Sequence, residues 1–187
     1  MARPGEHMST FFTADLHIGH ANILKHCQRP FASPDEMHGF LMSAWNETVS
    51  AADTVYVLGD FSFVGSTRIP MVEALLANLA GRKILIRGNH DSDGLQGWDE
   101  VHDFLVIKEG NRLLTLFHYP LRDWPGMWNG GIHLYGHVHG NQEPLPGSMD
   151  VGVDVWGGRP VTLDEIERAV RPFAKPAGNA PFRVQSW

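Results

Sequence analysis

Apolar and polar positions in the first half of the chain follow a strand-helix-strand-helix-strand order. Short β-rich apolar runs predict three strands, at residues 10–14, 54–58 and 83–87. Two helices are predicted between them, at residues 34–49 and 69–79. A capping-box pattern at Ser33 begins the first helix, and Gly81 follows the end of the second. This order predicts an α/β sheet in this half.

The second half of the chain is richer in predicted strands. Strands are predicted at residues 104–108, 113–117, 132–135 and 150–155. The first two flank Glu109-Gly110-Asn111, which has the composition of a hairpin connection. A second capping-box pattern at Thr162 begins a closing helix that ends near Arg171. We therefore expect two sheets packed together, with helices outside.

The predicted elements group into one domain with two flanking segments. Residues 1–8 have the composition of a flexible leader, residues 9–173 hold all the predicted elements, and residues 174–187 form an irregular tail rich in proline and glycine. A chain of 187 residues is large enough to bury one sound core.

Composition and charge restrict the classes of function. With 43% hydrophobic and 19% charged residues, the chain is typical of globular proteins. Its formal net charge of −6 and its lack of a basic stripe argue against strong nucleic-acid binding. Cys27 is the single cysteine, which excludes an intramolecular disulfide and favours a reducing compartment. No apolar run approaches the ~18 residues that span a bilayer, so we expect no membrane association and a cytoplasmic location. The sequence does not indicate the oligomeric state.

Metal-binding side chains follow the predicted strands at five places. These are Asp15-x-His17, Gly59-Asp60, Gly88-Asn89-His90-Asp91, His118 and Gly136-His137-x-His139. Each motif alone is weak, because a short acidic or histidine motif is more often a turn than a ligand pair. All five together, each after a strand, favour one shared site, since ligands gather at the carboxyl ends of strands in α/β sheets. Carboxylate, imidazole and amide donors without a thiol suit manganese, iron, zinc or magnesium.

Two-metal phosphoester hydrolysis is one chemistry that this set of donors could support. It requires two cations about 3.5–4 Å apart, a hydroxide between them and a proton donor for the leaving oxygen. Asp60, directly after a buried strand, is the best candidate for a carboxylate that bridges both cations. Asp15 and His17, two residues apart in extended chain, project to the same side and could reach one cation. His137 and His139 have the same spacing.

The ordered series of motifs resembles the calcineurin-like metallophosphoesterase family over about residues 10–155, and within it a compact bacterial or phage subgroup. The resemblance implies a four-layer α/β/β/α sandwich of two mixed sheets. It also implies a dinuclear metal centre at which a metal-bridging hydroxide attacks the phosphoester. Manganese is the favoured metal, with iron, zinc, nickel, cobalt or magnesium as alternatives.

The same resemblance implies roles for individual residues. It assigns the first metal to Asp15, His17, Asp60 and His139, and the second to Asp60, Asn89, His118 and His137. His90 would contact a phosphoryl oxygen or protonate the leaving group, and Asp91 would tune the charge of His90.

Several residues near these motifs could contact the substrate or support a ligand. His20 and Asn22 would line the mouth of the site, although a loop histidine and a turn-capping amide are the simpler interpretation. Arg87 could clamp a phosphate through its fork of donors, or pair with a surface carboxylate. Asp154 could orient a ligand histidine, or pair with Arg159.

The leading hypothesis for function is a phosphodiesterase that acts on small or nucleotide-like substrates. A phosphomonoesterase or protein phosphatase is the alternative within the same chemistry. A non-catalytic scaffold of the same fold is a third hypothesis, but such modules tend to lose the Asn-His step or a ligand, and here every motif is present.

Overall fold

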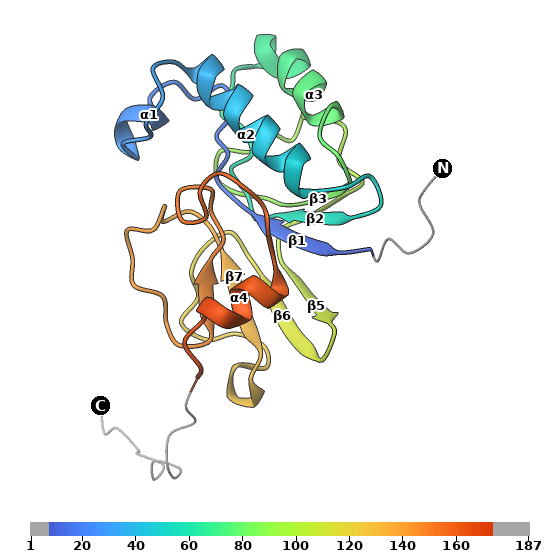
Figure 1. Ribbon diagram of the computed structural model, residues 1–187, viewed down its shortest axis with the longest axis vertical. Coiled ribbons are helices and arrows are strands. Elements are labelled where there is room, and N and C mark those ends of the chain that lie inside the picture. Colours follow the sequence, from blue (N-terminus) through green and yellow to red (C-terminus); the bar gives the residue numbers. More distant parts are fainter. Residues whose placement is uncertain (1–7, 174–187) are drawn as a thin grey trace, which may run out of the picture.

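The computed structural model describes residues 8–173, which form two packed sheets with helices (Figure 1). The predicted tail, residues 174–187, and all of the predicted leader except Met8 lie outside the described residues. Met8 itself is 80% exposed.

The first sheet has five strands in the order β4-β3-β2-β1-β9. They are β1 (Thr10–Thr13), β2 (Thr54–Val57), β3 (Arg82–Ile86), β4 (Glu100–His102) and β9 (Val161–Thr162). The first four are parallel, and β9 runs antiparallel to β1, so the sheet is mixed. Helices α2 (Pro34–Thr48) and α3 (Ile69–Ala77) lie against one face (Figure 1). There Val55 and Val57 share a buried cluster with Trp45 and Leu76.

The second sheet has four strands in the order β5-β6-β7-β8. They are β5 (Leu105–Glu109), β6 (Arg112–Leu116), β7 (Ile132–Tyr135) and β8 (Ser148–Asp150). β5 and β6 form an antiparallel hairpin, while β6, β7 and β8 are parallel. Leu116 and Leu134 pack with Phe12 and Ile86 of the first sheet, and helix α4 (Leu163–Ala169) adds Ile166 to the same cluster. The predicted fold class, α/β with two packed mixed sheets, is confirmed.

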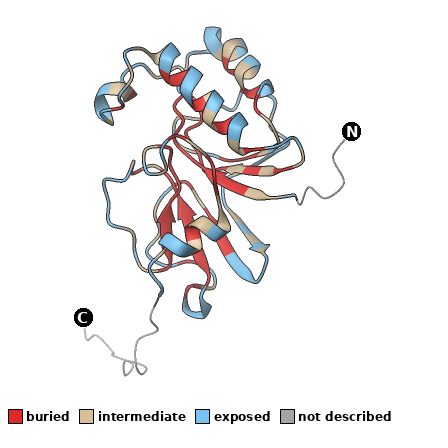
Figure 2. Ribbon diagram, in the orientation of Figure 1, coloured by how far each residue is buried: buried red, intermediate tan, exposed pale blue. Residues whose placement is uncertain are grey.

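The second sheet is also covered on the face turned away from the first sheet. His133 and Thr115 alternate with the inward-facing leucines, and Trp124 and Pro125 lie against them. This cover includes the short 3-10 helix η2 (Met127–Asn129). Figure 2 shows the result: buried residues gather in the strands and on the helix faces turned toward them. Within the described part of the chain, no helix is both long and apolar enough to cross a membrane.

The sequence predictions differ from the structure in the shortest elements and at β8. The predicted strand at 150–155 is wrong, because β8 ends at Asp150 and the chain then turns. The carboxylate of Asp150 accepts hydrogen bonds from the backbone N–H groups of Gly140 and Gly152, which fixes that turn. Strands β4 and β9 and helix α1 (Ile23–His26) were not predicted. They have three, two and four residues, too few to establish a periodicity.

Candidate metal centre

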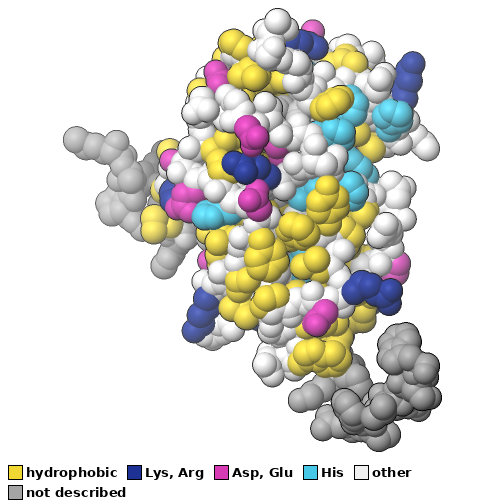
Figure 3. All heavy atoms as spheres, turned by 180° about the vertical axis from the view of Figure 1, so that it is seen from behind, with side chains coloured by type: hydrophobic (Ala, Val, Ile, Leu, Met, Phe, Trp, Pro, Cys, Tyr) yellow, Lys and Arg dark blue, Asp and Glu magenta, His cyan; other side chains and the backbone are white. Residues whose placement is uncertain are grey.

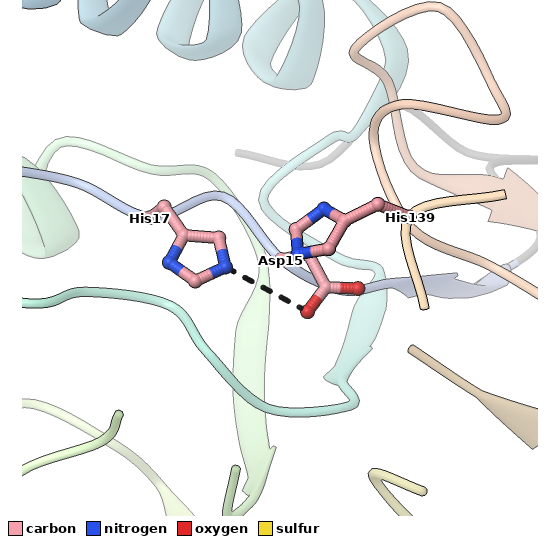
Figure 4. A group of neighbouring side chains, drawn as sticks. All are labelled: Asp15, His17 and His139. Atoms are coloured by element: carbon pink, nitrogen blue, oxygen red, sulfur yellow. Dashed lines mark ion pairs between the residues drawn. The ribbon is translucent and has the colours of Figure 1, made fainter. Parts of the chain in front are cut away.

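Strand ends bring the five predicted motifs together. Strands β1, β2, β3, β6 and β7 each end two or three residues before the first metal-ligand candidate of their motif. The side chains form two groups: Asp15, His17 and His139 in one (Figure 4), and Asp60, His118 and His137 in the other. Within each group the possible ligand atoms all lie within 4.8 Å of one another.

The carboxylate of Asp60 connects the two groups. Its Oδ2 lies 3.6 Å from Nε2 of His17 and 3.5 Å from Nε2 of His118. Oδ1 of Asn89 lies 3.1 Å from the same nitrogen of His118. All seven predicted metal ligands are therefore close neighbours, with Asp60 in the shared position that its place after β2 suggested.

Two buried polar atoms of this cluster are unsatisfied within residues 8–173. They are Oδ1 of Asp15 and Nε2 of His17, 4.0 Å apart (Figure 4). Burial raises the pKa of Asp15 to about 7 and lowers the pKa of His17 to about 3. A buried acceptor pair without partners is costly, and a bound cation would satisfy both atoms. The donor set, with its carboxylates, imidazoles and one amide oxygen, fits hard or borderline divalent cations.

Hydrogen bonds to neighbouring groups orient two of the ligand histidines. Nδ1 of His118 donates to the carbonyl oxygen of Leu58 at 2.8 Å, so Nε2 points into the cluster toward Asp60 and Asn89. Nδ1 of His139 donates to Oδ2 of Asp154 at 2.7 Å. Asp154 in turn accepts from Nε and Nη2 of Arg29 at 2.8 and 2.7 Å.

The position of Asp154 decides between its two predicted roles. It orients His139, and the predicted pairing with Arg159 is wrong, because Arg159 pairs with Glu165 instead. Arg29 is a component that the sequence did not reveal. Its guanidinium also donates to the carbonyl oxygens of Asp15 and Leu16, at 2.7 and 3.0 Å, and so holds the loop after β1.

Backbone strain concentrates at the same residues. Six non-glycine residues in the described part of the chain have left-handed φ angles: Asp15, His17, Gln28, Asp60, His137 and His139. Five of these six are predicted ligands. Such conformations cost free energy and persist where the surroundings enforce them, often at functional sites.

Two glycines make room for the ligands. A Cβ atom on Gly88 would lie 2.2 Å from Oδ1 of Asp60, and one on Gly59 would lie 2.3 Å from Nδ1 of His118. Neither position has space for a larger residue. Close packing against the candidate ligands thus explains why glycine precedes Asp60 and Asn89 in these two motifs.

His90 lies at the edge of the cluster and Asp91 beneath it. The backbone N–H of His90 donates to Oδ1 of Asp60, and its ring Nε2 lies 4.0 Å from Oδ2 of the same carboxylate. The carboxylate of Asp91 accepts from the backbone N–H groups of Asp60, Phe61 and Gly88 at 2.8–2.9 Å. Both of its oxygens therefore bind backbone. These contacts support a role for Asp91 in fixing the two ligand loops, and the predicted tuning of His90 by Asp91 stays a prediction.

The three predicted substrate contacts have different surroundings. Nδ1 of His20 lies 3.3 Å from Nδ1 of His17, and its ring packs near His90, so His20 is part of the site. Asn22 is exposed and lies directly before α1, where its backbone oxygen accepts from the first helical turn. Arg87 contacts the exposed carboxylates of Asp93 and Asp103, which is the predicted surface pairing, and the phosphate clamp stays a prediction.

Two exposed aromatic residues next to the cluster were not predicted from the sequence. The ring of Phe63, 47% exposed, lies 4.4 Å from that of His90 between centroids. The ring of Tyr119, 38% exposed, lies 4.6 Å from that of His137, and its hydroxyl donates to Oδ1 of Asn89 at 3.4 Å. Each closely follows a ligand motif, which is the signal that could have identified them. Figure 3 shows histidines gathered beside a broad hydrophobic area on this face.

Comparison with known proteins gives a family and several relatives. The family model for calcineurin-like phosphoesterases matches residues 8–187. An uncharacterized protein of Methanocaldococcus jannaschii is 34% identical over 167 residues, which cover 86% of this chain and 90% of that protein. The gene 66 protein of Mycobacterium phage D29 is 32% identical over 197 residues, covering 87% of this chain and 96% of the phage protein.

A solved structure is similar in fold. It is a protein of unknown function from Aquifex aeolicus, with a TM-score of 0.72 and 23% sequence identity. The superposition covers 88% of this chain and 100% of that chain. The two proteins therefore share the arrangement of both sheets.

Proposed function

The chain belongs to the calcineurin-like phosphoesterase family, and on that premise we propose that it hydrolyses small or nucleotide-like phosphodiesters at a centre of two divalent metal ions. The observation that carries the proposal is the position of Asp60. One of its oxygens lies within 3.6 Å of a histidine nitrogen in each of the two groups of ligand atoms.

The proposed ligand sets follow these two groups. One metal would be held by Asp15, His17, Asp60 and His139, and the other by Asp60, Asn89, His118 and His137. Manganese is the proposed metal, and iron, zinc, nickel, cobalt or magnesium would suit the same donors. When bound, such ions neutralise phosphoryl charge and lower the pKa of a water molecule so that it can attack phosphorus.

The side chains around the ligands have distinct proposed tasks. His90 would donate a proton from Nε2 to the leaving oxygen, since its ring lies beside Asp60 and is 31% exposed. Asp154 and Arg29 would hold His139 with its Nε2 toward the cluster. Asp91 would keep the loops of Asp60 and Asn89 at a fixed separation through its backbone hydrogen bonds.

The pairing of a buried arginine beside the cluster favours a diester over a monoester. Arg29, with a side chain only 4% exposed, is engaged by Asp154. It therefore offers no free cation for the second negative charge that a phosphomonoester carries near neutral pH. This supports phosphodiesterase activity over the monoesterase alternative. The cytoplasmic location stays a prediction.

A comparison of two chromogenic substrates tests the proposal. The protein loaded with manganese should hydrolyse bis-p-nitrophenyl phosphate faster than p-nitrophenyl phosphate, and Asp60→Asn should lose both metals and both activities. A reversed preference would support the monoesterase. A protein that takes up no metal and hydrolyses neither substrate, with manganese, nickel, cobalt or zinc supplied, would instead support the scaffold.

A further inference from the structure

A cavity of about 390 Å³ adjoins the proposed metal centre. Its walls are residues 27–31, Phe40 and Leu41 of α2, residues 153–154 and 157–158, and His139. We call it the Phe40 cavity. Leu41 and Val153 in its wall are buried, and the rings of Phe31 and Phe40 lie 5.3 Å apart between centroids. Its volume falls in the range of small-molecule sites, roughly 300–1,000 Å³.

Two unusual backbone positions lie in the wall of this cavity. Gly158 has a φ of +87°, and a Cβ atom there would lie 2.5 Å from Cε1 of Phe40, so a side chain would displace that ring. Gln28, also in the wall, has a left-handed φ of 51°. Of the six non-glycine residues with this geometry in residues 8–173, Gln28 is the one outside the ligand set. Strain of this kind marks segments whose shape is enforced by their surroundings.

The charges in the wall determine which part of a substrate the cavity could accept. Arg29 is the basic side chain here, and two of its nitrogens donate to Asp154. The pair is therefore neutral overall and offers no free cation to a phosphate. The remaining surface is largely apolar and aromatic, and Gln28 contributes an exposed amide at the rim. Such a site suits a flat, uncharged ring that stacks on an aromatic residue and presents a polar edge.

His139 connects the cavity to the metal centre. One side of its imidazole belongs to the group with Asp15 and His17, while its Nδ1 bonds Asp154 in the cavity wall. A single imidazole ring thus separates the two sites. A phosphodiester whose phosphate lies at the cluster could place one substituent in the cavity.

We propose that the Phe40 cavity binds the retained substituent of the phosphodiester, as a flat uncharged ring such as an aryl group or a nucleobase. This inference rests on the proposed function, because it assigns the substrate class of the same centre. Phe40, 46% exposed, provides the accessible stacking face. Phe31 and Leu41 form the apolar wall behind it.

Three esters with the same leaving group test the proposal. They are methyl p-nitrophenyl phosphate, bis-p-nitrophenyl phosphate and the p-nitrophenyl ester of thymidine monophosphate. Each releases p-nitrophenolate, so differences in kcat/KM report the retained methyl, aryl or nucleoside group. The manganese-loaded protein should prefer one or both ring-bearing esters over the methyl ester, and the stronger preference distinguishes an aryl from a nucleobase site.

Phe40→Ala should reduce that preference by about fivefold to tenfold, mainly through KM, because it removes the stacking face. The matched control is Phe104→Ala, since Phe104 is similarly exposed at 43% but packs against Phe117 and does not line the cavity. The control should leave the preference unchanged. An unchanged preference in Phe40→Ala, or an equal loss in both variants, would overturn the proposal.

A binding measurement separates this proposal from the proposed function. Hydrolysis of all three esters without a ring preference would refute the ring site and still support phosphodiesterase activity. If none of the esters is hydrolysed, the proposed function fails. The ring site is then tested separately, by measuring the binding of thymidine and p-nitrophenol with saturation-transfer NMR. Signals that Phe40→Ala abolishes and Phe104→Ala retains would support the ring site. Absence of signals in the unaltered protein would refute it.

Discussion

Replacing Asp154 with asparagine should weaken metal binding and destabilise the metal-free protein. The carboxylate accepts hydrogen bonds from Nδ1 of His139 and from two nitrogens of Arg29, at 2.7–2.8 Å. Asparagine keeps the shape but loses the charge, and its NH₂ group has no acceptor in Arg29, nor in His139 while Nδ1 carries the proton that leaves Nε2 free for a metal. At least one of those hydrogen bonds must therefore break.

The size of each effect follows from the two partners. Loss of the group that orients a ligand histidine typically costs 10–100-fold in metal affinity, or about 1.4–2.7 kcal/mol. The guanidinium of Arg29 is the second partner, with a side chain only 4% exposed. Removing one member of a buried ion pair costs about 3–5 kcal/mol, because the other charge stays buried. That is a large share of a typical total stability of about 5–15 kcal/mol.

Asp103→Asn is the matched control. It makes the same substitution in an Asp–Arg pair, but here the Asp103 side chain is 79% exposed and lies 3.2 Å from Arg87. Exposed pairs contribute about 0–1 kcal/mol, so stability should change little and metal affinity not at all. Competition with a metal-binding dye measures affinity, and urea unfolding of the metal-free protein measures stability.

Either of two results would refute this reasoning. Metal affinity of Asp154→Asn within twofold of the unaltered protein would mean that Asp154 does not orient His139. A loss of stability no larger than that of Asp103→Asn would mean that Arg29 does not depend on Asp154 for its charge balance.

Three further predictions concern His90, Asp15 and Gly88. His90→Ala should lower kcat by about 10²–10⁴-fold without changing the metal-to-protein ratio, and loss of metal would make His90 a ligand instead. Because burial raises the pKa of Asp15 to about 7, the metal-free protein holds a proton there at lower pH. Metal binding must release that proton, so metal affinity should fall as the pH drops below about 7. Metal titrations across that pH range would measure the fall, and a metal affinity independent of pH would contradict the prediction. Gly88→Ala, with its Cβ 2.2 Å from Asp60, should lower the occupancy of both metals, whereas Gly39→Ala, with no atom within 4 Å, should not.

Local signals predicted most of the elements, and long-range contacts account for those that were missed. Helix α4 begins with a capping box at Thr162 and Glu165, a pattern complete within four residues. Strand β9 has two residues and exists through its pairing with β1, about 150 residues earlier in the chain. No pattern in its own sequence could reveal it. The alternation at 150–155 was misread for a more local reason: the carboxylate of Asp150 accepts hydrogen bonds from the backbone N–H groups of Gly140 and Gly152, which fixes a turn.

In the candidate site, too, some residues could be predicted from local signals and others depend on long-range contacts. That the candidate ligand residues lie together could be predicted because each follows a strand, and strand ends meet at one edge of an α/β sheet. The supporting residues could not. Arg29 reaches Asp154 across 125 positions of sequence, and nothing beside Arg29 indicates that contact. Asp91 looked like a partner for the adjacent His90, yet its oxygens bind backbone amides 30 and 31 residues earlier.

The left-handed backbone of five candidate ligand residues restricts which residues could replace them during evolution. Aspartate and histidine tolerate that conformation better than most side chains, so the residue types that hold a cation also suit the loop. Alanine or a branched residue would remove the metal-ligating side chain and also strain the turn. Glycine would remove the ligand and leave the turn relaxed. A descendant retained only as a binding module should therefore be recognisable by glycine at the vacated positions.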